Sequence, residues 1–560
     1  MRPTFAPLAL LAIALAGCAT TPPPAATASA PVTAPAAPPL APPRLIVAIS
    51  VDQFSGDSFA QYRQHYTGGL ARLQHGAVFP SAYQAHAATE TCPGHSTLLT
   101  GARPNRTGII ANNWFDLGVA RADKRIYCAE DPTDPASTSR NPVVSPAQLK
   151  VPTLGDRMKA ANPASRNVAV SAKDRAVMMM GGHSIDEGYW WKNGAFVTLS
   201  GRDLAPAAVA ENAAAAAVIK AGAPAFAVPA ICAPYDRPVI VGKSTIGTGR
   251  FQLEPGKADA FRVSPRMDGA TFSLALRLVD DMELGRRSAP DLLSVSLSAN
   301  DYIGHAVGSE GVEMCIQMVA LDRMLGDFLA GLDARGLDYM VVLSADHGGL
   351  DTPERLAQQA LPRATRADRS LLPAELGRLV TQRTGISVDG PLVYADGPFG
   401  DYYVSRSLSS QDKARAVAAL VQIFRAHPQV AAVFTAEELA AAPAPVGSPQ
   451  EWSLRDRARE SFDPRRSGDV VVLLDRAVVP IPDPNPGYTA THGSPWDYDR
   501  RVPLMFWRKG LPGFEQPAPV ETVDIAPTLA AVLGLDVPAG AFDGRCLDID
   551  GSSANTCGAE

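Results

Sequence analysis

The chain has 560 residues, 46% of them hydrophobic, and a formal net charge of -6. This length allows one large α/β domain with insertions, or two domains, and the apolar fraction is ordinary for a globular protein with a sizeable core. The mild acidity and the scattered Lys and Arg residues argue against nucleic acid as a main partner, because a phosphate backbone binds to a basic stripe or patch.

The N-terminus is typical of an exported protein. Arg2 precedes an apolar run over residues 7–16 that is too short to span a bilayer, and small residues lead from it to Cys18. This order resembles a bacterial lipobox, in which Cys18 carries the lipid; an ordinary signal peptide with a chance cysteine is the alternative. Residues 1–18 are therefore predicted to be a lipoprotein signal peptide. The mature protein would be anchored at Cys18 to a bacterial membrane, facing the periplasm or the exterior.

Residues 19–44 are almost entirely Ala, Pro and Thr, a composition that predicts a disordered tether, so we expect folded structure to begin at Leu45. Beyond Cys18 the chain has six cysteines, an even number that permits up to three disulfides in an exported protein. Cys546 with Cys557 is the favoured pair. The other pairings stay open, as do free buried thiols.

Short apolar runs, each followed by an aspartate, recur along the chain. Residues 45–51 lead to Asp52, residues 291–297 to Asp301, and residues 339–343 to Asp346. Helical patterns over residues 270–284 and 312–332 precede the second and third runs. Alternating helices and buried strands predict an α/β fold with a central, mostly parallel sheet and helices on both faces.

The segment around residues 352–468 lacks this alternation, and we interpret it as an inserted cap region. The core is expected to resume near Asp469 and to close with a strand over residues 502–507 and a helix over residues 525–535. The catalytic domain would then span residues 45–550, and residues 551–560 would form a C-terminal tail.

Carboxylates and imidazoles gather where the predicted strands end. Any one of these residues alone would more often be a helix cap or a surface histidine. Together they favour a catalytic zinc site, because polar groups at the carboxyl ends of parallel strands converge at one edge of the sheet. The candidate metal ligands are Asp52, Asp301, His305, Asp346, His347 and His492.

A hydroxyl in the segment Thr89–Gly101 is the candidate nucleophile. Pro93 suits the first turn of a helix, which puts Thr91 or Cys92 at its cap, at the positive end of the helix dipole. A divalent cation beside Thr91 would promote loss of its hydroxyl proton. The alternative is that Thr91 only caps the helix.

Six short motifs occur in register, together with a closing pattern at residues 523–529: Asp52, Thr91-Cys92-Pro93-Gly94-His95, residues 108–112, Asp301 with His305, Asp346-His347-Gly348 and Thr491-His492-Gly493. The chain resembles the alkaline phosphatase superfamily in its type I phosphodiesterase/nucleotide pyrophosphatase-like branch. Within that branch it is similar to the threonine-nucleophile alkaline phosphatases.

The resemblance implies two zinc ions per chain. One would be surrounded by Asp52, Thr91, Asp346 and His347, and the other by Asp301, His305 and His492. Thr91 would attack phosphorus and form a covalent phosphothreonine. Cys92 invites comparison with the sulfatases, but their Cys-x-Pro-x-Arg frame is absent, since Pro93 follows directly.

Three residues bear on the ester that is used: Asn112, Lys173 and Arg175. Fixed cations favour the dianion of a monoester, and an Asn with a Lys-x-Arg pattern is similar to the monoesterase subgroup. Lys173 and Arg175 follow a predicted strand over residues 167–170; a solvated loop is the alternative.

The sequence thus predicts hydrolysis of small-molecule phosphate monoesters for phosphate scavenging outside the cytoplasm, by a chain for which we favour a monomer. A phosphodiesterase or nucleotide pyrophosphatase with the same metal core is the alternative. The non-enzymatic alternative is a lipid-tethered binding protein that retains only the fold.

Overall fold

The structure is a computed structural model that describes residues 41–550 and 555–557. The predicted signal peptide with Cys18, residues 19–40 of the tether and most of the predicted tail lie outside the described residues. The first element is strand β1 (Leu45–Val51), where folded structure was expected to begin. None of the described helices is long and apolar enough to cross a membrane.

A ten-stranded sheet forms the centre of the molecule, in the order β19-β2-β18-β11-β1-β10-β5-β6-β7, with β20 also pairing with β2. The five neighbouring strands β11, β1, β10, β5 and β6 are parallel, whereas β18 and β7 join antiparallel. The predicted α/β class with a mostly parallel sheet is confirmed. The strands besides β1 are β2 (Ala77–Tyr83), β5 (Asn167–Ser171), β6 (Glu187–Lys192), β7 (Ala195–Val197), β10 (Asp291–Leu297), β11 (Tyr339–Ser344), β18 (Arg501–Arg508), β19 (Phe514–Glu515) and β20 (Val520–Glu521).

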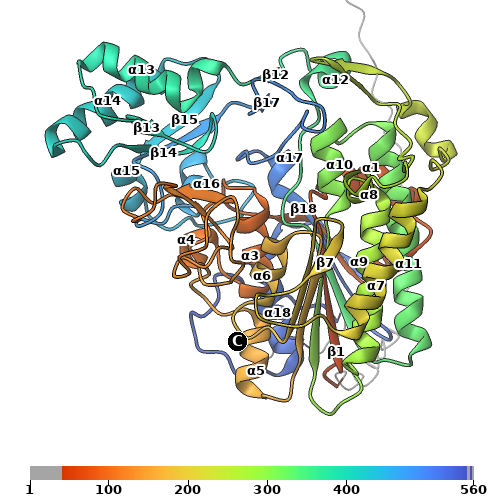
Figure 1. Ribbon diagram of the computed structural model, residues 1–560. Coiled ribbons are helices and arrows are strands. Elements are labelled where there is room, and N and C mark those ends of the chain that lie inside the picture. Colours follow the sequence, from red (N-terminus) through yellow and green to blue (C-terminus); the bar gives the residue numbers. More distant parts are fainter. Residues whose placement is uncertain (1–40, 551–554, 558–560) are drawn as a thin grey trace, which may run out of the picture.

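Helices cover both faces of this sheet (Figure 1). One face carries α7 (Pro206–Ala221), α9 (Pro265–Asp281) and α11 (Val312–Ala334), and the other carries α3 (Thr91–Thr100), α5 (Leu154–Ala161), α6 (Asp174–Gly181) and α18 (Ile525–Leu533). Helix α9 begins five residues before the expected start, because Ser264 accepts a hydrogen bond from the amide of Arg266 and Pro265 occupies the first turn.

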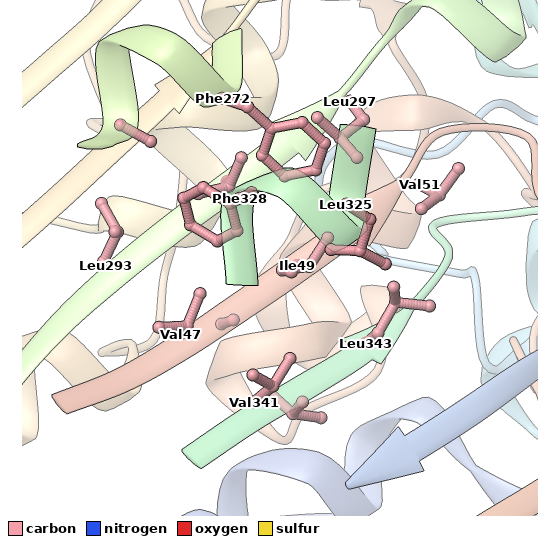
Figure 2. Packing of buried hydrophobic residues seen from close by; sticks show 14 of the residues in the cluster. Val47, Ile49, Val51, Phe272, Leu293, Leu297, Leu325, Phe328, Val341 and Leu343 are labelled. Atoms are coloured by element: carbon pink, nitrogen blue, oxygen red, sulfur yellow. The ribbon is translucent and has the colours of Figure 1, made fainter. Parts of the chain in front are cut away.

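Burial on both faces explains why the strands are continuous apolar runs rather than alternating ones. Every residue of β1, β10 and β11 is buried. On the α9/α11 side, the stacked rings of Phe272 and Phe328 lie 4.7 Å apart over the side chains of Val47 and Ile49 (Figure 2). The packed sheet is the rigid base from which the strand ends project.

Residues 365–479, here called the cap, form a second unit with its own hydrophobic cluster. Its four-stranded sheet has the order β13-β14-β16-β15, and a short parallel pair, β12 with β17, adjoins it. Its elements are β12 (Thr365–Arg366), α13 (Pro373–Thr384), β13 (Val393–Tyr394), β14 (Gly400–Val404), α14 (Ser410–Arg425), β15 (Val430–Thr435), α15 (Ala436–Ala440), α16 (Leu454–Arg459), β16 (Val470–Leu474) and β17 (Val478–Val479).

The structure moves the end of the insertion beyond the expected residue 468. Strand β16 was expected to resume the core, but it pairs with β14 and β15 and packs within the cap. An apolar run in the sequence indicates that a strand is buried, but it does not indicate which of the two sheets contains the strand.

Three disulfides join Cys92 to Cys128, Cys232 to Cys315, and Cys546 to Cys557, the last being the pair that the sequence favoured. The shorter elements used below are β3 (Asn113–Phe115), β4 (Arg125–Tyr127) and α10 (Ala299–Val307).

Candidate active site

Four adjacent parallel strands deliver charged side chains to one edge of the central sheet. Asp346 follows β11, Asp52 follows β1, Asp301 lies in α10 just after β10, and Lys173 follows β5. Because neighbouring parallel strands end at the same edge, these residues converge although they are far apart in sequence.

The carboxylates and imidazoles form two groups, and within each group the ligand-type atoms lie within 4.8 Å of one another. One group contains Asp52, Asp346 and His347, and the other contains Asp301, His305 and His492. The rings of His347 and His492 stack at 3.6 Å, so the two groups adjoin. This is the division that the resemblance implied.

Each of the three imidazoles is oriented by a main-chain carbonyl. Their Nδ1 atoms lie 2.9 Å from the oxygen of Ala490 for His305, 2.8 Å from that of Gly348 for His347, and 2.7 Å from that of Thr89 for His492. A carbonyl can only accept, so Nδ1 carries a proton and Nε2 is the nitrogen that would bind a cation, in place of a proton.

Several atoms of these groups are buried without a hydrogen-bond partner among the described residues: Asp52 Oδ1, Asp301 Oδ1 and His347 Nε2. Buried polar atoms normally have a hydrogen-bond partner, so buried atoms of this kind without one indicate a site for a bound ion. Carboxylate oxygens and imidazole Nε2 atoms are the donors that zinc takes in catalytic sites. The residues present therefore fit two divalent cations.

The pKa values in the site also indicate that it lacks compensating positive charge. Burial, together with Asp301 and Asp346, raises the pKa of Asp52 well above its usual range. Although burial opposes a charge on His347, the adjacent Asp346 raises its pKa to about 9. Burial lowers the pKa of His492 to about 3, which keeps that imidazole neutral. Cations bound here would stabilise all three carboxylates in their ionised form.

Thr91 is fully buried and is the first residue of α3, with Glu90 in the N-cap position. From the sequence, Thr91 or Cys92 was expected at the cap, so the helix begins one residue earlier than the first of these alternatives. The helix approaches the main chain of Asp346 so closely that a Cβ on Gly94 would collide with the Asp346 carbonyl. Gly94 thereby lets the start of α3 lie against one of the two ligand groups.

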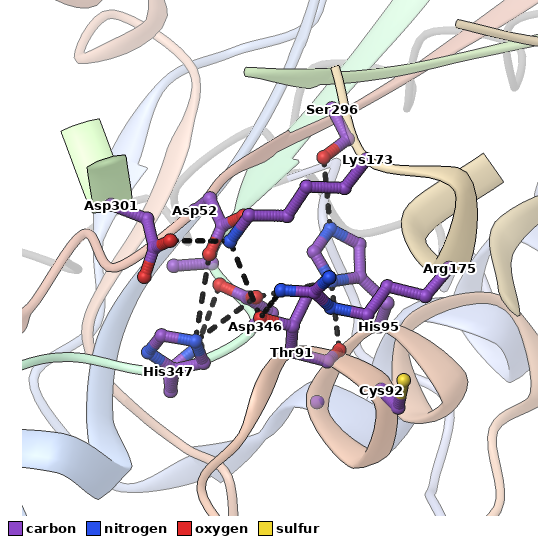
Figure 3. A network of polar contacts seen from close by, with 12 residues as sticks. Asp52, Thr91, Cys92, His95, Lys173, Arg175, Ser296, Asp301, Asp346 and His347 are labelled. Carbon is purple, nitrogen blue, oxygen red and sulfur yellow. Dashed lines mark hydrogen bonds and ion pairs between the residues drawn. The ribbon is translucent and has the colours of Figure 1, made fainter. Parts of the chain in front are cut away.

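Two positively charged side chains point at the Thr91 hydroxyl (Figure 3). Lys173 Nζ donates to Thr91 Oγ1 at 3.3 Å, and Arg175 Nη2 donates to it at 3.4 Å. Lys173 also pairs with Asp301 Oδ2 at 2.5 Å and with Asp52, and so contacts one carboxylate of each group. The surroundings of Oγ1 thus favour a negatively charged oxygen.

Asn112 lies beside Thr91 through contacts with the two residues that flank it, Glu90 and Cys92. Its side-chain oxygen accepts a hydrogen bond from the main-chain amide of Cys92 at 2.8 Å. Its main-chain amide donates to Glu90 Oε2 at 2.9 Å. The structure therefore brings all three candidate substrate-binding residues to Thr91.

Two further histidines, His95 and His183, differ in position. His95 Nδ1 lies 2.9 Å from the Thr91 carbonyl oxygen and 3.1 Å from Asp346 Oδ2. Its Nε2 lies 3.0 Å from Ser296 Oγ. His95 therefore connects Thr91 and Asp346 to strand β10. The side chain of His183 is 44% exposed beside Asp156, which is not among the site residues.

A cavity of about 370 Å³ opens between the site and the cap. Its lining includes Asn112, Arg175, His305 and His492 and, besides these, residues that the sequence analysis missed: Glu90, Phe115, Asp396, Phe399 and Tyr488. Only Glu90 had a signal, its position directly before Thr91. The others lie in loops and strands without a diagnostic pattern.

Fold and site together place this chain in the alkaline phosphatase superfamily of α/β enzymes. The family described as type I phosphodiesterase / nucleotide pyrophosphatase matches residues 46–495, and the chain belongs to that family.

The chain is 51% identical to alkaline phosphatase PhoK of Sphingomonas sp over 519 residues, which cover 92% of each chain. It is 49% identical to alkaline phosphatase PhoD of Zymomonas mobilis, with 92% of this chain and 89% of the relative covered. The crystal structure of alkaline phosphatase PafA superposes with a TM-score of 0.79 at 25% identity, covering 92% of this chain and all of PafA.

Proposed function

We propose that this protein is an exported, metal-dependent alkaline phosphatase that hydrolyses small-molecule phosphate monoesters through a phosphothreonine at Thr91. The observation that carries the proposal is the position of Thr91 Oγ1, which receives hydrogen bonds from Lys173 and Arg175 beside two buried groups of metal-ligand type. The resemblance to enzymes named alkaline phosphatases supports it independently.

Asp52, Asp346, His347 and Thr91 would hold one cation, and Asp301, His305 and His492 the other. Two bound zinc ions would acidify a coordinated hydroxyl, neutralise phosphoryl oxygens and stabilise the departing oxygen. The imidazole ligands favour zinc over harder divalent ions.

The chain's own residues would perform the following steps. Lys173 and Arg175 stabilise the deprotonated oxygen of Thr91, which attacks phosphorus as the bond to the leaving group breaks. Water then attacks phosphorus, the bond from phosphorus to Thr91 Oγ1 breaks, a proton of the water restores the Thr91 hydroxyl, and inorganic phosphate leaves. Because phosphoryl transition states are loose, orientation and charge stabilisation contribute most of the rate.

Monoesters are favoured over diesters by charge. Two dications would exceed the three carboxylates by one unit, and Lys173 and Arg175 add two more positive charges beside Thr91. A monoester dianion gains more from such surroundings than a singly charged diester.

We also propose that the protein is lipid-anchored at Cys18 outside the cytoplasm and releases phosphate from esters there, acting as a monomer. The lipobox-like order around Cys18 supports the anchor. Labelling with a radioactive fatty acid in a bacterial host, with Cys18→Ala as the control, tests it; equal label in both chains would contradict the anchor.

The function is tested by steady-state hydrolysis of an aryl phosphate and a bis-aryl phosphate by zinc-loaded enzyme, with Thr91→Ala beside it. We expect kcat/KM to be larger for the monoester, and Thr91→Ala to lose turnover by roughly a thousand-fold or more while it stays folded. Thr365→Ala, at an exposed threonine of the cap, is the matched control. A larger rate on the diester would replace the monoesterase with a phosphodiesterase, and no turnover of either ester would leave a binding protein.

A further inference from the structure

The disulfide Cys92–Cys128 joins the residue after the nucleophile to the end of strand β4. Both half-cystines are fully buried. The other two disulfides have different surroundings: Cys232–Cys315 ties a short 3-10 helix to α11, and Cys546–Cys557 closes a loop near the C-terminus. Of these three, only Cys92–Cys128 is adjacent in sequence to the nucleophile.

Asn112 lies between the two half-cystines. The amide of Cys92 donates to Asn112 Oδ1 at 2.8 Å, and the amide of Cys128 donates to the Asn112 carbonyl at 3.0 Å. Glu90 accepts from the Asn112 amide at 2.9 Å. These three contacts orient Asn112, which lines the cavity, and its Nδ2 group is the donor that they leave for a ligand.

The same hairpin also reaches the second phosphate-binding residue. Strands β3 and β4 pair antiparallel, and the hydroxyl of Tyr127, directly before Cys128, donates to Asp174 Oδ1 at 2.5 Å. Asp174 Oδ1 also accepts from the amide of Arg175, whose guanidinium contacts Thr91. The hairpin is therefore in contact with supports of both Asn112 and Arg175.

We propose that the Cys92–Cys128 disulfide is a positioning element for monoester recognition. It fixes the β3–β4 hairpin to the start of α3 and so keeps Asn112 and Arg175 in register with the Thr91 oxygen. The disulfide does not itself contact the reacting atoms. Because preorganised donors act only when correctly placed, the enzyme reaches its full rate only in the oxidised form. This inference rests on the proposed monoesterase function.

The central test compares the pair variant Cys92→Ala/Cys128→Ala with the matched pair Cys232→Ala/Cys315→Ala. We expect the first pair to lower kcat/KM on an aryl phosphate about ten- to a hundred-fold, and to weaken competitive inhibition by inorganic phosphate, because a preorganised donor is misplaced. Turnover of a bis-aryl phosphate should change less than about three-fold. The second pair should lower the Tm without changing either rate constant.

A double-mutant cycle separates positioning from a general loss of stability. If the disulfide acts through Asn112 and Arg175, removing it in an Asn112→Ala/Arg175→Ala background should cost only a small part of what it costs in wild type. Fully additive losses, or equal losses on both esters, would overturn the inference.

Reduction of wild type provides a measurement that does not depend on folding of the variant. Two thiols of dithiothreitol supply the two electrons and two protons that convert a disulfide to two cysteine thiols, and the reagent becomes a cyclic disulfide. Loss of monoester turnover should follow alkylation of Cys92 and Cys128, located by mass spectrometry, rather than alkylation of the other four disulfide-forming cysteines.

Unchanged turnover after full reduction of Cys92 and Cys128 would overturn the inference and leave the proposed function intact. Wild type without phosphatase activity before reduction would instead overturn the proposed function.

Discussion

The edge of the central sheet and the cap contribute to the same cavity in different ways. At the sheet edge, Asp52, Asp301 and Asp346 are buried at the ends of packed strands, and the imidazoles are held by main-chain carbonyls. The cap contributes Asp396 and Phe399 from a loop, neither of them fully buried. We infer from this difference that, under the proposed function, the sheet edge performs the chemistry and the cap contacts the leaving group of the substrate.

The largest effect expected from this comparison comes from removing a ligand at the sheet edge. Asp346→Asn should lower kcat/KM by roughly a thousand-fold, because it removes several kcal/mol of charge stabilisation, and should reduce the zinc content of the purified protein. Asp389→Asn, at an exposed residue of the cap, is the matched control for both measurements. Full activity with two bound zinc ions in Asp346→Asn would show that the chemistry is located elsewhere.

Replacing Lys173 and Arg175 with Ala should lower kcat/KM on an aryl phosphate by about a hundred- to a thousand-fold, as expected for removal of preorganised charged donors. The loss on a bis-aryl phosphate should be smaller, because the diester carries less charge. Arg378→Ala, at an exposed arginine of the cap, should change neither rate constant. Equal losses on the two esters would contradict the assignment of the cation pair to monoester recognition.

The cap is probed by Phe399→Ala. If this ring contacts the leaving group, KM for an aryl phosphate should rise by up to about ten-fold, since an aromatic pair contributes about 0.5–1.5 kcal/mol beyond its buried area. KM for a small alkyl phosphate should stay constant. Val446→Ala, at a cap residue that is 89% exposed, controls for general effects on the cap. A large fall in kcat on both substrates would contradict the division of labour between edge and cap.

The smallest expected effect concerns stability rather than turnover. Asp268 supports α10, since its Oδ1 accepts from the amide of Ala299 and its Oδ2 from Gln317 Nε2 at 2.7 Å. Burial raises the pKa of Asp268 from 3.8 to about 7. The folded state therefore binds this proton more tightly than the unfolded state. Its stabilising contribution is complete below about pH 4 and is lost as the pH rises through about 7.

Urea unfolding at pH 5 and pH 8 checks this sign. The free energy of unfolding of wild type, relative to that of Asp268→Asn, should be lower at pH 8 than at pH 5, because the side-chain amide of the variant does not titrate. A constant difference between the two proteins would mean that Asp268 is ionised throughout.

The fold and the sheet-edge residues were predictable for a physical reason. A run such as residues 45–51 is apolar throughout because helices cover both faces of the sheet, and the aspartate at its end marks the edge. Strand β16 has the same character and was assigned to the core, although it pairs within the cap. Periodicity reports burial, and only tertiary packing decides between two sheets.

The candidate site was predictable to the extent that its residues follow strands or match short motifs. His492 has no predicted strand before it and was proposed as a distant member of the carboxylate and imidazole set; its position depends on the Thr89 carbonyl, a contact between distant segments. Phe399 and Tyr488 line the cavity through loop packing, which has no sequence period. The partners of Cys92 and Cys232 stayed open because disulfide pairing depends on distance in space.

Strand β2 pairs, within the described residues, with β18, β19 and β20, all of which follow residue 500. Helix α3 starts soon after β2 and is held from behind by Thr522, whose Oγ1 lies 3.0 Å from that of Thr97. During synthesis the nucleophile thus emerges early, but its support is made last. Such distant pairings form slowly. In the described sheet β2 is joined to β11 through β18, so until β18 is in place β2 lacks these partners and β11 is the open sheet edge, exposed to association with other chains. We therefore expect the candidate site to assemble late, once β18 has been made, and a chain that ends before β18 to expose the edge of β11 and to leave α3 without the contact from Thr522.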